Sequence, residues 1–313
     1  MKDLTEFLEL FMEKTGFPED SRDTFRAYNR ALLAGEASRA AFDSIVKLYE
    51  SDDPTPFFPP LDELSESLGF HKYTGDLFIF MYQAWFLREA YKEKGLPEQI
   101  YWDSMTDLRA KLIECRDVYG VNGSFVASWF HGFFELTRFA LGRLQFEWTQ
   151  YSREEPYTCC GHSVSKGDTL INMHIPSLGP LTVDLMMDAF KRAYNFPLFA
   201  DVRVPGTDWM PFCCGSWLLY PPHYDFLPAK SNILKFMDCF DIVEWSDSEE
   251  FSDKWRVFGK YKDAEPADLP RDTSLRRAFA ERLESGQKTG HGWGIFFFDG
   301  EKIIRPDDAG AAV

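Results

Sequence analysis

Residues 169–192, TLINMHIPSLGPLTVDLMMDAFKR, decide the fold of this chain. The first residues alternate between apolar and polar side chains, and this period of two predicts a strand with one apolar and one polar face. Pro176 ends the strand because proline has no N–H to donate to a sheet. After a short loop, Thr182 is a suitable N-cap for a helix. Apolar side chains then recur at helical spacing, which predicts one buried helix face: Val183, Met186, Met187, Phe190 and Tyr194.

This stretch therefore forms a strand, a glycine-containing loop and a helix N-terminus. The loop is Ser177-Leu178-Gly179-Pro180-Leu181. Free N–H groups and the helix dipole make such a terminus suitable for an anion. Most connections of this kind bind no ligand, and one glycine is weaker support than a glycine-rich fingerprint. The local pattern leaves both an anion site and a purely structural connection open.

Composition narrows the range of partners. The chain has 313 residues, enough for one large or two ordinary domains, and thirty of them are phenylalanine. Its net charge of −16 argues against non-specific binding to nucleic acid or to an anionic membrane surface, because phosphates would be repelled. A cationic or amine-bearing partner is compatible with this charge, and so is a role in solubility alone. We therefore expect neither nucleic acid nor membrane as a partner.

The segments that could target the chain elsewhere lack the required features. The most apolar window, residues 77–87, is about half the roughly 20 residues that a membrane span needs, so it predicts a core helix. The first residues, MKDLTEF, are acidic and amphipathic, unlike a signal peptide. Together with six cysteines, this predicts reduced thiols and a cytoplasmic protein.

The period of the apolar pattern divides the chain into two domains. Residues 1–121 are helical throughout, apart from a proline-rich loop expected at residues 51–60. Residues 122–313 begin with a helix from Ser124 that carries aromatic side chains as far as Phe139. The period then changes from 3.6 to 2, which predicts a domain built on a sheet.

In this second domain, antiparallel strands come first, then a strand–helix–strand crossover, then more strands, which predicts an α+β sheet with helices on its faces. The terminal residues 309–313 are expected to be frayed. Strands and helices beyond the central helix are predicted at residues 211–219, 240–245, 254–258 and 293–298 (strands) and at 231–237 and 272–283 (helices).

Five short sequence motifs in this half resemble those of a known family. They are LGRLQFE (141–147), KGDTLINMHIP (166–176), SWLL (216–219), SNILKF (231–236) and DTSL (272–275). The chain resembles bacterial two-domain proteins in which a helical N-acyltransferase N-terminal domain precedes a GNAT-like C-terminal domain. The resemblance implies an all-α domain followed by a GNAT-like mixed sheet with helices on both faces. It also implies transfer of an acyl group from acyl-CoA, or a similar thioester, to an unidentified acceptor such as an amine, directly in a ternary complex and without a metal.

The resemblance also implies where the donor binds. In GNAT enzymes, backbone N–H groups of the loop and helix after the central strand bind the pyrophosphate, and the next strand diverges to hold the pantetheine arm. That strand would be residues 213–219, and the helix after it would flank the cofactor. This chain lacks the usual Gln/Arg-x-x-Gly-x-Gly/Ala motif, Pro180 removes one donor, and Asp184 competes with phosphate for the helix dipole. The implied cofactor-binding residues are Met173, Ile175, Ser177, Leu178, Gly179, Leu181, Thr182, Ser216 and Asn232.

Acyl transfer to an amine needs aligned reactants, a base for the ammonium proton and an acid for the thiolate. His174, at the end of the central strand, is the candidate base, or alternatively a structural histidine bonded across the sheet. Glu147 is a candidate for relaying a proton through water, or else forms an ion pair with Arg143. Tyr220 and Tyr224 follow the diverging strand and are candidates for the acid, or else pack as aromatics.

Two other classes of function remain open at this point. A catalytically silent GNAT-like fold would bind a small ligand or a protein partner, and the altered phosphate loop favours it. A metal or cysteine enzyme would use Cys159, Cys160, His162, Cys213 and Cys214, but these lack the C-x-x-C spacing of common zinc sites, and adjacent strand residues point to opposite faces. We therefore expect no metal.

Overall fold

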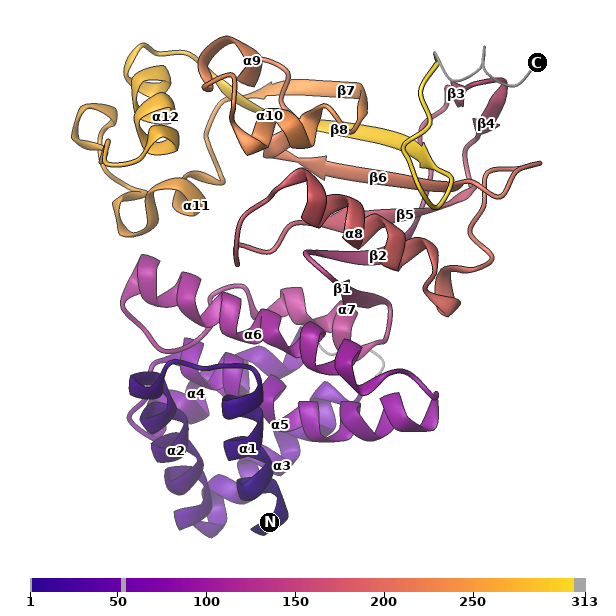
Figure 1. Cartoon of the computed structure of the whole chain (residues 1–313). Helices are drawn as coiled ribbons and strands as arrows, with labels where there is room; N and C mark the ends of the chain where they lie inside the picture. The colour runs from indigo at the N-terminus through magenta and orange to yellow at the C-terminus, as the bar shows by residue number, and fades with distance from the viewer. Residues whose placement is uncertain (1, 52–54, 307–313) are drawn as a thin grey trace. The chain divides into compact units, whose positions relative to one another are not determined.

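A computed structural model describes residues 2–51 and 55–306, and the chain divides into two compact units, residues 1–136 and 137–313 (Figure 1). The sequence placed the domain boundary after residue 121. Residues 122–126 lie against the start of the fifth helix: the Ser124 N–H donates to the Tyr73 carbonyl at 2.9 Å. A Cβ at Gly123 would lie 2.2 Å from the same oxygen, so only glycine allows this approach. The expected frayed tail, residues 309–313, lies outside the described residues.

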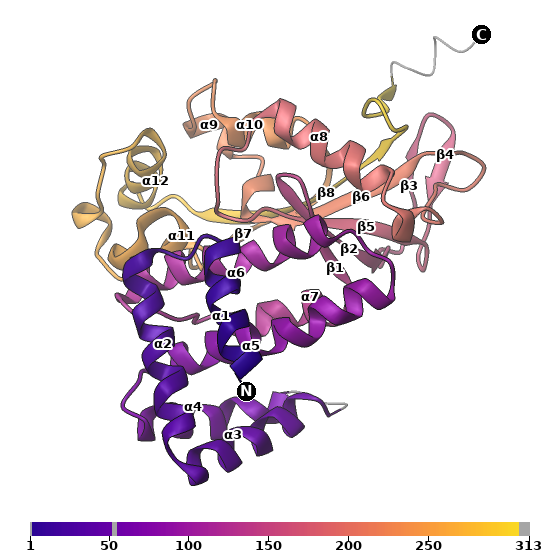
Figure 2. The ribbon, with the colours of Figure 1, turned by 60° about the horizontal axis from the view of Figure 1, so that its bottom comes forward.

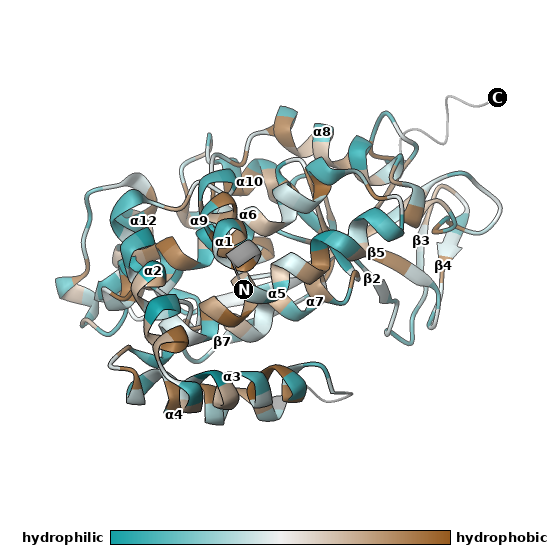
Figure 3. Cartoon of the chain, turned by 90° about the horizontal axis from the view of Figure 1, so that it is seen from below, coloured by the Kyte–Doolittle hydropathy of each residue, from teal (hydrophilic) through white to brown (hydrophobic). Residues whose placement is uncertain are grey.

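The first unit consists of helices, as predicted. Apolar and polar stretches alternate along α2 and α3, as expected for amphipathic helices (Figure 3). The predicted core helix at residues 77–87 is confirmed, because residues 77–81 in α5 are fully buried. None of the helices within the described ranges is long and apolar enough to cross a membrane. The helices are α1 (Lys2–Lys14), α2 (Glu19–Ala34), α3 (Glu36–Tyr49), α4 (Phe58–Ser67), α5 (Lys72–Glu93), α6 (Glu98–Tyr119) and α7 (His131–Phe134).

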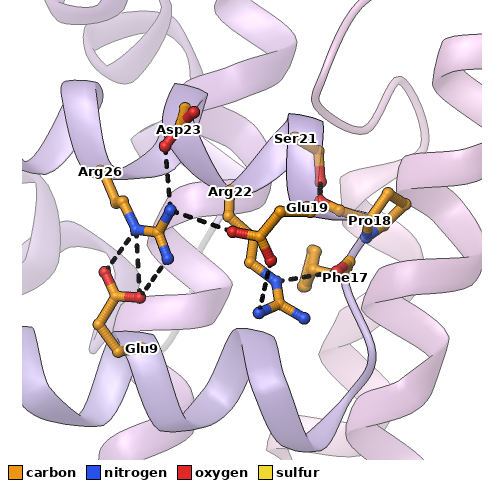
Figure 4. A network of polar contacts seen from close by, with 8 residues as sticks. All are labelled: Glu9, Phe17, Pro18, Glu19, Ser21, Arg22, Asp23 and Arg26. Atoms are coloured by element: carbon orange, nitrogen blue, oxygen red, sulfur yellow. Dashed lines mark hydrogen bonds and ion pairs between the residues drawn. The ribbon is translucent and has the colours of Figure 1, made fainter.

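A polar network joins α1 to α2 (Figure 4). Arg26 of α2 donates to Glu9 of α1 through Nε and Nη2, each at 2.8 Å, and to Asp23 at 2.9 Å. The carboxylates are largely exposed, so each pair contributes at most about 1 kcal/mol. Arg22 Nε donates to the Phe17 carbonyl at 2.9 Å and so supports the turn before α2. The network therefore adds little to the packing of the two helices through their apolar faces.

Two predictions for this unit are wrong. From residue 55 onward the expected loop is helical: a 3₁₀ turn (Thr55–Phe57) leads into α4, with prolines in the first turn. Proline is tolerated there because first-turn N–H groups have no partner within the helix. The predicted helix from Ser124 to Phe139 is instead a 3₁₀ turn (Ala127–Phe130), then α7, and Phe139 lies in a strand. Residues 52–54 of the expected loop lie outside the described residues.

The second unit is built on a six-stranded mixed sheet in the order β1-β2-β5-β6-β8-β7, in which only β5 and β6 run parallel. The predicted α+β class is confirmed. The strand predicted at residues 254–258 is wrong, because five residues are too few to separate a period of 2 from one of 3.6. The elements are β1 (Arg138–Leu141), β2 (Leu144–Gln150), β3 (Tyr157–Cys159), β4 (His162–Val164), β5 (Thr169–His174), α8 (Val183–Tyr194), β6 (Met210–Ser216), α9 (His223–Phe226), α10 (Asn232–Met237), β7 (Asp241–Ser248), α11 (Lys254–Phe258), α12 (Ser274–Glu284) and β8 (Thr289–Phe298).

Different elements cover the two faces of this sheet. Helix α8 runs along one face (Figures 1 and 2), where Phe190 packs against Phe212 and Phe296 at centroid distances of 5.6 and 5.1 Å. The predicted buried face of α8 is confirmed at Phe190 and Met186, whereas Val183 is 42% exposed. The β3–β4 hairpin packs on the opposite face, where it forms an apolar cluster with residues of the sheet.

A row of glycines in β8 lets other segments lie directly on the sheet. Gly290, Gly292 and Gly294 alternate along the strand and so share one face. A Cβ at Gly292 would lie 1.9 Å from the Leu219 carbonyl oxygen, and one at Gly290 would lie 2.2 Å from the Tyr220 ring. The chain that leaves β6 is therefore held against β8 at a distance that any side chain would prevent.

We expect Gly292→Ala to lower the free energy of unfolding of the second unit by about 1–3 kcal/mol, because the added methyl meets backbone that must move. Urea denaturation followed by tryptophan fluorescence measures this. Gly215→Ala is the control: its Cβ would meet only side-chain atoms, at 3.3 and 3.4 Å, so its effect should be smaller. Equal stability of Gly292→Ala and the wild type would contradict the packing of Leu219 on β8.

Candidate functional site

The two parallel strands at the centre of the sheet pair only briefly. β5 and β6 are in register at Ile171/Phe212 and Asn172/Cys213. Beyond these pairs β5 continues to His174 alongside β2, and β6 continues to Ser216 alongside β8. Each strand thus keeps its antiparallel partner after the parallel ladder ends. The facing edges of the two strands past this point are not paired with each other.

The loop after β5 leads to a helix start without a side-chain cap. Thr182 occupies the predicted N-cap position of α8, but its side chain makes no capping hydrogen bond, contrary to the prediction. The first helical bond runs from the Met186 N–H to the Thr182 carbonyl, so the first-turn N–H groups have no partner in the helix. Gly179 has a φ of +77°, and a Cβ there would meet nothing within 4 Å. In general, the N–H groups and the dipole of an uncapped helix start attract anions.

Arg143 contacts this loop and does not pair with Glu147. Its Nε donates to the Pro180 carbonyl at 2.8 Å, and its Nη2 donates to the Gly179 carbonyl at 3.1 Å. The predicted Arg143–Glu147 ion pair is therefore wrong. The two residues are four apart in the chain. Arg143 lies in the turn between β1 and β2, one residue before the strand that carries Glu147 begins. Its side chain reaches the neighbouring loop more easily than the strand.

Glu147 instead joins His174 to Arg138. Its Oε1 lies 2.6 Å from His174 Nε2, and its Oε2 accepts from Arg138 Nε at 2.8 Å and Nη2 at 2.7 Å. Asn172 Nδ2 also lies 3.3 Å from Oε1. The strand registers explain this grouping: Arg138, Glu147 and Asn172 are direct cross-strand neighbours on β1, β2 and β5, so they share a face with His174. We call these four residues the carboxylate network.

The electrostatics of the network determine the state of the imidazole. Burial raises the pKa of Glu147, but the hydrogen bonds and positive charges of His174 and Arg138 outweigh this and hold the pKa at about 2. The carboxylate is therefore ionised at neutral pH and can only accept hydrogen bonds. The hydrogen in the 2.6 Å contact therefore lies on His174 Nε2. Whenever the imidazole is neutral, this places its lone pair on Nδ1. The His174 side chain is 22% exposed.

Two members of this network, Arg138 and Asn172, were not identified from the sequence. Arg138 was missed because its segment was interpreted as helix. Once Leu141 and Leu144 are paired across the two-residue turn, the register places Arg138 opposite Glu147. The alternation of β5 places Asn172 on the same face as His174. The pairing of β1 with β2 was the signal that could have identified both.

The remaining candidates lie apart from the network. Ser216 Oγ accepts from the Leu218 N–H at 3.1 Å and caps a 3₁₀ turn (Trp217–Leu219), so the predicted strand 213–219 ends at Ser216. Tyr220 is buried and donates to Asp247 at 2.5 Å. Tyr224 is 52% exposed and donates to Asp238 at 2.6 Å.

Three further residues of this region are Ser231, Asn232 and His223. Ser231 Oγ accepts from the Ile233 N–H at 3.2 Å, and Asn232 is the exposed first residue of α10. His223 Nε2 lies 2.8 Å from the Trp217 carbonyl oxygen. Burial lowers the pKa of His223 to about 4, so it is neutral and packed among aromatic rings.

The cysteines considered as nucleophiles or metal ligands lie on β6 and at the β3–β4 turn. Burial raises the pKa of Cys213 to about 12, so at neutral pH it is a thiol and not a nucleophilic thiolate. Cys159 and Cys160 are adjacent at the β3–β4 turn, with their sulfur atoms 3.7 Å apart. Within residues 2–51 and 55–306 no three His, Cys, Asp or Glu side chains converge as metal ligands.

Comparisons with solved structures show proteins of the same fold. One is an acyltransferase in complex with decanoyl-CoA and teicoplanin, with 18% sequence identity, a TM-score of 0.65 and coverage of 94% of this chain and 93% of that chain. Another is an acyltransferase mutant in complex with octanoyl-CoA, with 18% identity, a TM-score of 0.65 and coverage of 93% and 87%. No curated protein matches the chain.

Two family models match consecutive parts of the sequence. The N-acyltransferase N-terminal domain matches residues 6–136, and the GNAT-like C-terminal domain matches residues 138–296. These matches confirm the resemblance carried by the five motifs, and they meet between residues 136 and 138, where the structure divides into its two units. The chain therefore belongs to the two-domain N-acyltransferase family, in which an N-acyltransferase N-terminal domain precedes a GNAT-like C-terminal domain.

Proposed function

We propose that this protein transfers an acyl group from acyl-CoA to an amine-bearing acceptor, directly in a ternary complex. The observation that carries the proposal is the early end of the β5–β6 ladder immediately before an uncapped helix N-terminus. Acyl-CoA matches both features, because its diphosphate accepts hydrogen bonds from N–H donors and its amide-containing arm can pair with an unpaired strand edge. The two solved acyltransferases of this fold are in complex with medium-chain acyl-CoA, which makes octanoyl-CoA a suitable probe.

The donor site consists of two parts in this proposal. Met173 and Ile175 on one side and Ser216 on the other flank the pantetheine arm where the strands separate. The exposed Asn232 flanks the cofactor from α10. The diphosphate lies at the loop and helix start, where the backbone N–H groups are provided by Ser177, Leu178, Gly179, Leu181 and Thr182.

His174 is the proposed general base. The amine nitrogen attacks the thioester carbonyl carbon, a C–N bond forms, the C–S bond breaks and the thiolate leaves. His174 Nδ1 takes the proton that the attacking nitrogen loses. Glu147, fixed by Arg138, holds the imidazole in the tautomer with its lone pair on Nδ1 and stabilises the imidazolium that forms. Glu147 is thus a positioning residue, and a relay of protons through it is not required.

Tyr224 is the proposed acid that returns a proton to the thiolate. Both tyrosines after β6 donate to an aspartate, but Tyr224 is 52% exposed whereas Tyr220 is 1% exposed. Tyr220 would have to leave its packing on β8 to reach a substrate. We therefore assign Tyr220 a structural role.

The acceptor is proposed to be an amine because the chain carries a net charge of −16, which attracts ammonium groups before they deprotonate. One solved acyltransferase of this fold holds teicoplanin together with its donor. We further propose a cytoplasmic location, since all six cysteines are free thiols, as is usual in a reducing compartment.

We expect octanoyl-CoA to raise the melting temperature of the purified protein, because a ligand that binds only the folded form stabilises it. At a hundredfold excess over the dissociation constant this is about 2.7 kcal/mol. Differential scanning calorimetry measures the shift. Gly179→Val should reduce it, because a β-branched residue resists a φ of +77° and distorts the loop. If neither octanoyl-CoA nor CoA shifts the wild type, the catalytically silent fold replaces this proposal.

Replacement of the base should affect turnover and not donor binding. His174→Gln should lower kcat by about 10²- to 10⁴-fold, because the amine keeps its proton without a base. Release of CoA thiol from octanoyl-CoA, monitored across a panel of amines, measures this rate, and calorimetric titration measures the binding. His162→Gln, in the β3–β4 hairpin, is the control and should retain full activity. An unchanged kcat in His174→Gln would remove His174 from the mechanism.

The carboxylate network should also stabilise the fold in a pH-dependent way. The pKa of Glu147 is about 2 in the folded protein and near 4.5 when unperturbed, so its contribution is fully present above pH 4.5 and is lost as pH falls toward 2. Glu147→Gln should therefore lower the free energy of unfolding by about 3 kcal/mol at pH 7. The difference should shrink below pH 4.5 in urea titrations, and a difference that grows instead would contradict the assigned pairing.

A further inference from the structure

Arg143 connects the edge hairpin of the sheet to the proposed phosphate loop. It occupies the two-residue turn between β1 and β2, directly after Gly142, whose φ is +76°. Its guanidinium binds the carbonyls of Gly179 and Pro180, 36 and 37 residues later in the chain. Within the described ranges, no other side-chain hydrogen bond reaches residues 177–181. This one side chain therefore sets how the loop is turned.

The two bonds orient the polar groups of the loop. A carbonyl oxygen that faces the guanidinium cannot also face a phosphate, which it would repel. In a trans peptide the C=O and N–H groups point in opposite directions, and the described residues contain no cis peptide bond. Because the Pro180 carbonyl points toward Arg143, the Leu181 N–H points away from it. Arg143 thus turns the remaining donor of this peptide outward, beside the uncapped start of α8.

The charge of Arg143 is not compensated by the protein. Its Nη1 has almost no solvent-exposed surface and no hydrogen-bond partner in the described part of the chain. No carboxylate in residues 2–51 or 55–306 forms an ion pair with it, whereas Arg138 pairs with Glu147 and Arg192 with Asp188. A half-buried guanidinium without a counter-charge is unfavourable, and a nearby anion would offset that cost.

We propose that Arg143 is the positioning residue for the phosphate groups of acyl-CoA. The inference rests on the proposed function and deepens it, because it assigns recognition of the phosphates to a side chain outside the loop itself. Pro180 removes one N–H donor from the loop, and Asp184 places a negative charge in the first turn of α8. Arg143 counteracts both by holding two carbonyls away from the ligand and by adding a positive charge beneath the loop.

The test compares octanoyl-CoA with octanoyl-pantetheine. The second donor has the same acyl and pantetheine parts but lacks the diphosphate and the 3′-phosphoadenosine joined to it. Calorimetric titration of Arg143→Met should show affinity for octanoyl-CoA reduced about 10- to 100-fold, the effect of losing charged hydrogen bonds, with affinity for octanoyl-pantetheine unchanged. The affinity of Arg143→Lys for octanoyl-CoA should lie between those of Arg143→Met and the wild type. An ammonium keeps the charge but cannot donate to both carbonyls at once as the forked guanidinium does.

Arg192→Met is the matched control: it removes a guanidinium of the same unit that is paired with Asp188, and it should leave both affinities unchanged. Circular dichroism and melting confirm that each variant is folded. If the wild type does not bind octanoyl-CoA, the proposed function fails. Suppose instead that the wild type binds octanoyl-CoA. If Arg143→Met then binds it equally well, or loses affinity for both donors equally, the proposed role of Arg143 is overturned while the proposed function stands.

Discussion

The structure depends on the short parallel contact between β5 and β6. Parallel strands cannot be joined by a hairpin, so the chain crosses over through α8, which packs Phe190 on the sheet. Each strand has an antiparallel partner of its own on the other side, β2 for β5 and β8 for β6. The two can therefore separate after two residue pairs without losing those ladders. The separation and the start of α8 arise together from this one crossover.

Two arginines near this crossover have different partners: one binds a carboxylate and the other binds backbone carbonyls. Arg138 neutralises a buried carboxylate, and with His174 it lowers the pKa of Glu147 to about 2 despite the burial that would raise it. Arg143 is left without a carboxylate and binds two loop carbonyls instead. The first arrangement fixes a charge state inside the protein, and the second leaves a positive charge for a ligand. Both side chains belong to the hairpin formed by β1 and β2.

The glycines of β8 set the end of the diverging strand. After Ser216 the chain turns through Trp217–Leu219 and lies on β8, where Gly292 leaves room for the Leu219 carbonyl. Ser216 itself pairs with Gly292, so the end of β6 and the turn after it both lie against β8. On its other side, β6 is paired with β5 only as far as Cys213.

The sequence by itself determined the fold class, the family, the strand–loop–helix at residues 169–192 and the position of His174 on the polar face of its strand. Local periodicity and proline and glycine positions are sufficient for these, because they depend on neighbours in the chain. Only the tertiary structure decided the partner of Glu147, the contact of Arg143 with the loop and the burial of Tyr220. These depend on strand register and on contacts between residues far apart in sequence. For that reason the sequence pairs Arg143 with Glu147, four residues away on the same hairpin. In the structure Glu147 binds residues on the neighbouring strands, and Arg143 binds a loop.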